Sequence, residues 1–206
     1  MTDQRRASQA LSPPRLACLI SGGGRTVLNL LDSIERSELN ATIPLVISSN
    51  DTAAGVQRCR DRGLFVKVIP GVIPADTLEA LLREHNIDLV LLAGYLKLLK
   101  IPPSYHHRVL NIHPSLLPKH GGKGMHGHHV HEAVLKAKDQ ESGCTVHYVD
   151  DQFDTGAPIL QFRCPVLPTD TPETLAARVF ELECKAFPQA IRMALSCSPP
   201  AGGGRG

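Results

Sequence analysis

A carboxamide and an imidazole stand two residues apart, at Asn111 and His113, where an apolar run enters a loop that begins with Pro114. Residues 109–112 are predicted to form a buried strand, so both side chains point to one face. The proline ends regular pairing and holds both groups at the carboxyl end of the strand. An amide donor beside a titratable imidazole suits acyl or formyl transfer, in which a carbonyl oxygen becomes negative and a proton moves. The alternative is structural: Asn111 caps the strand and His113 is a hydrogen-bonded core histidine.

Three consecutive glycines, Gly22, Gly23 and Gly24, separate the first predicted strand from the first predicted helix. Backbone amides and the helix dipole can converge on an anion there, and Arg25 and Thr26 add a charge and a hydroxyl. The run fits neither the nucleoside triphosphate pattern G-x-x-x-x-G-K-[ST] nor the dinucleotide pattern G-x-G-x-x-G, so a small phosphomonoester is favoured. The alternative is a plain tight turn, although three glycines are costly unless the backbone must approach something closely.

Three acids, Asp150, Asp151 and Asp154, lie in a loop between two late predicted strands. They can supply the carboxylate that a proton-moving site needs, and Asp154 is the best candidate because it stands beside a Thr-Gly pair that fixes a turn. A carboxylate there is expected to raise the pKa of His113 and hold its orientation. The alternative is an ordinary solvated turn.

Five histidines crowd residues 119–131, at positions 120, 126, 128, 129 and 131. A metal site is one interpretation, but the segment lacks H-E-x-x-H or Cys/His spacing, is rich in glycine, and reads as a helix start over 129–137. We therefore predict no metal and favour a mobile loop that covers a substrate.

At 206 residues and 22.3 kDa, the chain can fill one core and is too short for two full domains. Hydrophobic residues at 42%, charged residues at 20% and a net charge of +2 are ordinary for a globular protein and give no reason to expect nucleic acid as a partner. We find no membrane-spanning run and no signal-peptide core, so we expect no membrane partner and a cytoplasmic location. The six cysteines form no C-x-x-C pair, which predicts free core thiols.

Short apolar runs alternate with amphipathic stretches over the first half of the chain. This pattern predicts a Rossmann-like α/β fold of three layers, with a parallel sheet covered on both faces. The predicted strands are residues 16–20, 43–48, 65–69, 89–92 and 109–112, and the helices between them are residues 27–37, 53–62 and 77–85.

The pattern changes after the central motif. Residues 145–149 and 159–166 are predicted to be strands that pair antiparallel, so the sheet as a whole is mostly parallel with antiparallel late strands. Residues 171–195 are predicted to close the fold as a long helix, which Pro188 can kink. The single domain then covers 15–195, and the Ser/Pro/Gly-rich ends, residues 1–14 and 196–206, are predicted to be disordered tails.

Four segments, in this order and spacing, resemble the phosphoribosylglycinamide formyltransferases of the folate-dependent formyltransferase superfamily. They are LISGGG at 19–24, LAGY at 92–95, NIHPSLLP at 111–118 and VHYVDDQFDTGAPILQ at 146–161, and the likeness extends from residue 15 to 195. The central motif is shared with the formyltetrahydrofolate deformylases. The extra N-terminal domain usual in deformylases and the extra C-terminal domain of methionyl-tRNA formyltransferases do not fit in 206 residues.

Carried over position by position, the resemblance implies catalytic, substrate-binding and folate-binding residues. The implied catalytic residues are Asn111, His113 and Asp154. The implied phosphate cradle is Gly24, Arg25 and Thr26, and Glu183 on the last helix is implied to hold the ribose hydroxyls, where an ordinary solvated acid is the alternative. The pterin of the folate is implied to lie against Leu96, Lys97, Leu98 and the loop 150–154, which includes Asp150 and Asp151.

The activity that the resemblance implies is transfer of a formyl group from 10-formyltetrahydrofolate to the amine of glycinamide ribonucleotide, a step of purine synthesis, with no metal. The alternatives are a formyltetrahydrofolate deformylase, in which water replaces the amine, and a non-catalytic protein that binds a phosphometabolite. Two segments depart from the family. The chain has Arg25-Thr26 where Ser-Asn is frequent, and His120 to His129 where a Tyr-Pro-Gly-Leu-His type segment is usual, so side-chain roles in that loop do not carry over.

Overall fold

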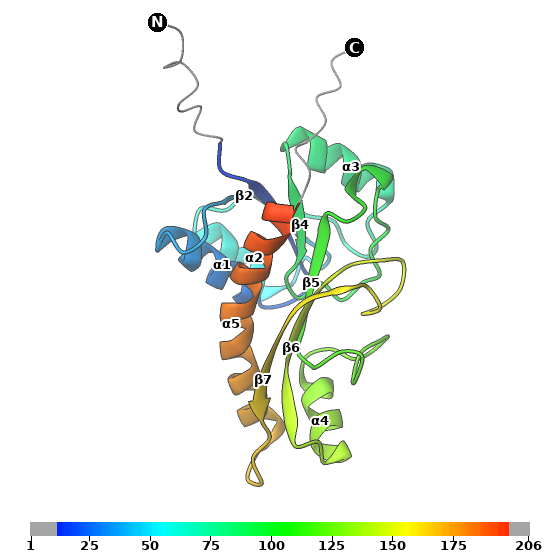
Figure 1. Cartoon of the computed structure of the whole chain (residues 1–206). Coiled ribbons are helices and arrows are strands. Elements are labelled where there is room, and N and C mark those ends of the chain that lie inside the picture. Colours follow the sequence, from blue (N-terminus) through cyan, green and yellow to red (C-terminus); the bar gives the residue numbers. More distant parts are fainter. Residues whose placement is uncertain (1–11, 198–206) are drawn as a thin grey trace, which may run out of the picture.

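A seven-stranded sheet with the order β3-β2-β1-β4-β5-β6-β7 runs through residues 12–197, the part of the chain that this computed structural model describes (Figure 1). The first five strands are parallel to one another, whereas β6 pairs antiparallel with β5 and β7 pairs antiparallel with β6. The predicted mixed sheet is therefore confirmed. The strands are β1 Arg15–Ile20, β2 Thr42–Ser48, β3 Val66–Val68, β4 Leu89–Leu92, β5 Val109–His113, β6 Glu141–Tyr148 and β7 Pro158–Pro165.

Helices cover both faces of the sheet. They are α1 Arg25–Glu35, α2 Ala54–Asp61, α3 Ala75–Glu84, α4 His128–Ala137 and α5 Pro172–Cys197, with a short 3-10 turn at Pro103–Tyr105. Alternate residues of β1 enter two different cores. Leu16, Cys18 and Ile20 pack with residues of α1 and α5, whereas Ala17 and Leu19 pack with residues of α3. The predicted three-layer arrangement is therefore confirmed.

The strand order reverses between β1 and β4, because β1 leads outward to β2 on one side and has β4 on the other. In open α/β sheets the connections leave such a point in opposite directions and open a crevice at the carboxyl ends of the strands. The glycine run follows β1, and the strand that carries Asn111 and His113 lies next to β4. The topology thus brings the two candidate motifs to one edge of the sheet.

Strand β6 and helix α5 are among the elements that extend beyond their predicted bounds. Strand β6 begins at Glu141, four residues earlier than expected. The prediction missed this start because the polar Glu-Ser-Gly sequence resembles a turn. In the strand, Gly143 pairs with Arg163, and a side chain on Gly143 would meet the carbonyl of Phe162. Helix α5 continues through Pro188 to Cys197, so the predicted C-terminal tail is wrong for its first two residues. Of the other predicted tail residues, 12–14 are described and belong to no helix or strand, whereas 1–11 and 198–206 lie outside the described part of the chain.

Five of the six cysteines are described with their side chains, and all five are free thiols as predicted. Four of them are buried and one, Cys184, is half-buried. Within residues 12–197 no helix combines the length and the apolar character needed to cross a membrane.

Candidate active site

A cavity of about 910 Å³ lies at the carboxyl ends of β1, β4 and β5. Much of its wall comes from the glycine run 22–26, the segment 92–99 after β4, the histidine-rich residues 122–128 and the inner face of α5, and the end of β5 and the loop that carries Asp154 also line it. The volume is at the upper end of the range usual for pockets that take small molecules. Both candidate motifs of the sequence therefore face one space.

The glycine run packs against the start of α2. Gly24 has a left-handed φ of 70°, and a side chain on it would meet Cα of Gly55 at 3.0 Å and Sγ of the buried Cys59 at 3.5 Å. The N–H of Gly55 donates to the carbonyl of Gly22 at 3.0 Å. Gly24 is thus required by the fold. Gly22 is not, because a side chain there would meet no atom within 4 Å.

Backbone N–H groups from Gly22 to Thr26 have no hydrogen-bond partner within residues 12–197. They stand at the N-terminus of α1, where the helix dipole also favours negative charge. Arg58 lines the same wall and donates from Nη1 to the carbonyl of Gly23 at 3.2 Å. This arrangement is suited to a phosphate or another small anion.

Arg25 does not extend freely into solvent, because its guanidinium lies over the ring of Phe180 on α5, 3.9 Å from the centroid. One turn further along α5, Glu183 is half-buried and lines the cavity. Burial raises the pKa of Glu183 to about 7, and the charge of Arg25 only partly opposes that shift. The predicted ribose-binding acid thus lies at the same end of the cavity as the glycine run.

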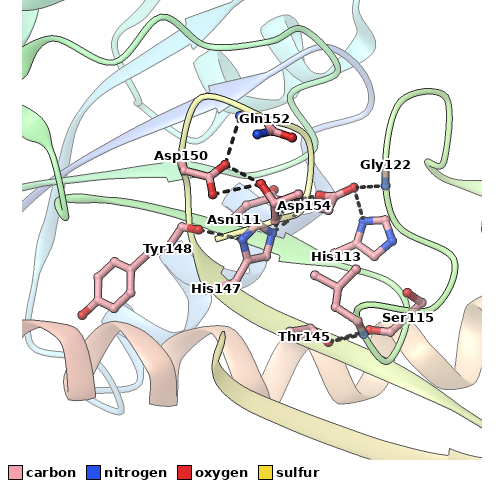
Figure 2. A network of polar contacts seen from close by, with 12 residues as sticks. Asn111, His113, Ser115, Gly122, Thr145, His147, Tyr148, Asp150, Gln152 and Asp154 are labelled. Carbon is pink, nitrogen blue, oxygen red and sulfur yellow. Dashed lines mark hydrogen bonds and ion pairs between the residues drawn. The ribbon is translucent and has the colours of Figure 1, made fainter. Parts of the chain in front are cut away.

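Asp154 lies at the centre of a network that joins three segments of the chain (Figure 2). Its Oδ1 accepts a hydrogen bond from Nδ2 of Asn111 at 3.2 Å, and its Oδ2 accepts one from the backbone N–H of Gly122 at 2.9 Å. Nδ1 of His113 is 3.4 Å from Oδ2, and Nε2 of His147 is 3.5 Å from Oδ1. The structure therefore brings Asn111, His113 and Asp154 together.

The network holds Asp154 in an uncommon backbone conformation and keeps its side chain ionised. Its backbone is left-handed, with a φ of 59°, a conformation that non-glycine residues adopt mainly where surrounding contacts impose it. Burial would raise the pKa of Asp154, but the His147 and His113 rings, in their protonated forms, and the N–H of Gly122 together lower it. The side chain is consequently a carboxylate at neutral pH.

His113 is buried, and its Nε2 donates to the carbonyl of His120 at 2.8 Å, since a carbonyl oxygen can only accept. Burial lowers the pKa of His113, and the opposing effects of Asp154 and of that carbonyl are smaller. The expectation that Asp154 raises the pKa of His113 is therefore wrong for the net shift, because desolvation outweighs the charge. His113 is neutral at neutral pH, with an unprotonated Nδ1 facing the carboxylate.

His147 completes the network and was not singled out from the sequence. It lies on β6 directly opposite Asn111, and its Nδ1 donates to the carbonyl of Tyr148 at 2.8 Å, which leaves Nε2 as an acceptor. Nδ2 of Asn111 lies 3.1 Å from that Nε2. Both amide N–H groups of Asn111 are thus used, one by His147 and one by Asp154. Only the antiparallel register pairs these residues, and the sequence carries no signal for it.

The loop between β5 and α4 is fastened to the late strands. Oγ1 of Thr145 donates to the carbonyl of Ser115 at 2.7 Å and accepts from the N–H of Leu117 at 3.0 Å. Nε2 of Gln161 donates to the carbonyl of Leu117 at 2.9 Å. These bonds fix the path of the loop and so place the carbonyl of His120, which accepts the hydrogen bond from His113.

Leu96, Lys97 and Leu98 line the cavity, and the two leucines are 45% and 40% exposed. The N–H of Leu96 donates to Oγ of Ser21, the residue before the glycine run, at 2.9 Å. Asp150 and Asp151 lie outside the cavity wall. Asp150 instead accepts hydrogen bonds from Oγ1 of Thr155 at 2.7 Å and from the N–H of Gln152 at 3.0 Å, so it shapes the loop that carries Asp154.

The histidine-rich segment divides between two environments. His126, His128 and His131 line the cavity, whereas the ring of His120 binds Asp139 at 2.8 Å. Glycines with positive φ at 122, 124 and 127 let the segment pass closely over the cavity. No group of three or more potential ligands among residues 12–197 is arranged to hold a metal ion. The mobility predicted for the loop stays a prediction.

Comparison with known proteins identifies the class. The sequence pattern of the formyl transferase family matches residues 14–191, so the chain belongs to that family. It is 33% identical to phosphoribosylglycinamide formyltransferase of Haemophilus influenzae, over 86% of this chain and 85% of that protein. The crystal structure of glycinamide ribonucleotide transformylase 1 from Symbiobacterium toebii superposes with a TM-score of 0.81 at 32% identity, covering 93% of this chain and 92% of the other.

A longer relative comes from a plant. The chain is 36% identical to the chloroplastic phosphoribosylglycinamide formyltransferase of Arabidopsis thaliana over 187 residues, which are 86% of this chain. It spans 64% of the length of that relative.

Proposed function

We propose that this chain transfers a formyl group from 10-formyltetrahydrofolate to the amine of glycinamide ribonucleotide, in purine biosynthesis. The observation that carries the proposal is a single cavity that is lined by Asn111, His113 and Asp154, by the glycine run with its free N–H groups and by two exposed leucines. A substrate with a phosphate at one end and an amine at the other spans from the glycine run to the cluster. Membership of the formyl transferase family supports the reaction type.

The ligand-binding roles follow from the residues that line the cavity. The free N–H groups from Gly22 to Thr26 donate hydrogen bonds to the phosphate, and Glu183 accepts hydrogen bonds from the ribose hydroxyls. The folate ring system lies against Leu96 and Leu98, whose apolar surface it covers. The proposal assigns no metal and places the reaction in the cytoplasm.

The reaction forms a bond between the amine nitrogen and the formyl carbon and breaks the bond between that carbon and the folate nitrogen. One proton moves from the amine to the folate nitrogen. Asp154 is a carboxylate and faces the unprotonated Nδ1 of His113 at 3.4 Å, so this pair can take up the proton and return it. Once protonated, His113 still donates from Nε2 to the carbonyl of His120 and faces Asp154 with Nδ1, so it stabilises the charge that develops on the formyl oxygen by its own positive charge and not by a hydrogen bond.

Asn111 acts on the same oxygen only after a hydrogen bond is exchanged. Both of its amide N–H groups donate inside the protein, to His147 and to Asp154. The bond to Asp154 is the longer one, at 3.2 Å, and is the one that the formyl oxygen replaces as it becomes negative. The gain is then realised mainly in the transition state, which is where an interaction raises turnover.

A direct assay tests the proposal. The absorbance change that accompanies deformylation of 10-formyltetrahydrofolate is followed with the purified chain, with and without glycinamide ribonucleotide. We expect turnover that depends on the ribonucleotide, with formylated ribonucleotide as product. Asp154→Asn serves as the matched control for contaminating activity.

Other outcomes separate the alternatives. Equal turnover without ribonucleotide, with formate as product, means that the chain is a deformylase and the proposal is wrong. Ribonucleotide binding by calorimetry with no turnover at all means a non-catalytic phosphometabolite-binding protein.

A further inference from the structure

His131 on α4 is a buried histidine that no contact within the protein explains. It is 4% exposed and lines the cavity, yet its Nδ1 is fully covered and has no hydrogen-bond partner. Neither ring nitrogen forms a hydrogen bond within residues 12–197. Because Nδ1 is covered, Nε2 is the nitrogen that a ligand in the cavity can reach. Polar groups of a nearly buried side chain are usually paired, so an unpaired Nε2 at the wall of a binding cavity points to a partner supplied by the ligand.

The two histidines of the catalytic cluster, His113 and His147, differ from His131. His113 and His147 each donate one ring N–H to a backbone carbonyl, which fixes their tautomers. Burial lowers the pKa of His131 to about 4, with His128 and His113 contributing, so its ring is neutral. A neutral ring has one donor and one acceptor. Since buried N–H groups without partners are rarer than buried acceptors without partners, the covered Nδ1 is the bare nitrogen and Nε2 carries the proton.

The position of His131 indicates which ligand it meets. Helix α4 packs on α5, the helix that contributes Ala176, Ala177, Phe180 and Glu183 to the cavity. His113 lines the same cavity as His131. His131 therefore enters the cavity from the helix that packs on the carrier of Glu183, the proposed ribose-binding acid.

We propose that His131 is a substrate-binding residue whose Nε2–H donates to a carbonyl oxygen of the formyl acceptor, next to the attacking amine. In glycinamide ribonucleotide that oxygen belongs to the amide one carbon from the amine. The inference rests on the proposed function, and it assigns to this chain a specificity contact for an α-amino amide. An acceptor with a free amine and no carbonyl in that position loses the contact.

The test is steady-state kinetics with each substrate varied in turn. His131→Leu removes both nitrogens at similar volume, and His131→Gln restores an amide N–H near the place of Nε2. We expect His131→Leu to raise the KM for glycinamide ribonucleotide about tenfold while the KM for the folate changes less than about twofold. His131→Gln should recover most of the affinity. His129→Leu is the matched control, because that histidine lies on the same helix, is 65% exposed and does not line the cavity.

Thermal unfolding of the same variants separates binding from folding. Because Nδ1 is unpaired, an apolar replacement is expected to leave the Tm of His131→Leu equal to or above that of the parent. An unchanged ribonucleotide KM, an equal rise in the folate KM, or a lowered Tm with no recovery in His131→Gln overturns the assignment. If the parent itself shows no ribonucleotide-dependent turnover, the proposed function has failed and this inference with it; a parent that turns over beside an unaffected His131→Leu means that only this inference has failed.

Discussion

Asp154 is the residue on which the other polar groups of the cluster converge. Asn111, Gly122, His113 and His147 all contact its two oxygens, from β5, β6 and the histidine-rich segment. Removing its charge therefore leaves three side chains in place but takes away the group that favours the protonated form of His113. The effect belongs to the transition state, where that protonated form is needed.

Asp154→Asn and His113→Ala are expected to lower turnover by on the order of 100-fold or more, with substrate KM values changed only a few-fold. Steady-state kinetics with both substrates measures this. Asp151→Asn is the control, since that acid is exposed and lies outside the cavity wall. If Asp154→Asn kept turnover within a few-fold of the parent, the assigned proton path would be wrong.

Among the elements, the glycine run combines a structural and a functional role in adjacent residues. Gly24 is fixed by its positive φ and by contact with α2, whereas Gly22 borders open space. The sequence shows three glycines without distinguishing them. A tight turn accounts for Gly24 but gives no reason for a glycine at position 22, so the phosphate explanation stays a prediction for Gly22.

Gly22→Ala is expected to weaken binding of the ribonucleotide about tenfold, because the added methyl group obstructs the approach of phosphate to the N–H groups, with a Tm close to that of the parent. Gly24→Ala is expected to lose about 1 to 2 kcal/mol of unfolding free energy, from its left-handed backbone. Calorimetric titration and chemical denaturation measure the two effects. Unchanged ribonucleotide affinity in folded Gly22→Ala would refute the phosphate assignment.

Most elements were predictable because their periodicity is strong. β4 matches its prediction at both ends, and β1, β2, β5 and α2 match within one residue, since short apolar runs bounded by turn residues have few alternatives. The start of β6 was not predictable, because Gly143 is required by the close approach of Phe162, a contact between strands. The direction of the pKa shift of His113 was predicted wrongly and the contacts of His147 were not predicted, for the same reason. Burial and cross-strand register are tertiary properties.

For the whole molecule, two ionisable side chains at the cavity wall, His131 and Glu183, give opposite dependences of stability on pH. The unfolded chain protonates His131 near 6.5 and the folded chain near 4, so folding is weakened as pH falls through that window. Glu183 keeps its proton up to about 7 when folded but releases it near 4.5 when unfolded. Its contribution is therefore lost as pH rises from about 4.5 to about 7.

Denaturant unfolding between pH 4 and 8 measures both contributions. His131→Leu is expected to show a smaller loss of unfolding free energy than the parent as pH falls from 6.5 to 4. Glu183→Gln is expected to lack the decline that the parent carries between 4.5 and 7. Parallel curves for the parent and both variants would show that neither group titrates differently in the folded state.

The position of Cys59 beneath Gly24 has a kinetic consequence. Burial raises the pKa of this thiol, so it is unreactive as long as the glycine run covers it. A reagent that labels thiols must wait for the run to lift away from α2, and the labelling rate then counts local openings rather than global unfolding. We expect an anion bound across the N–H groups to hold the run closed. The rate of thiol labelling at Cys59, which has no part in the chemistry, should then report how often the glycine run opens, and it should fall when the anion binds.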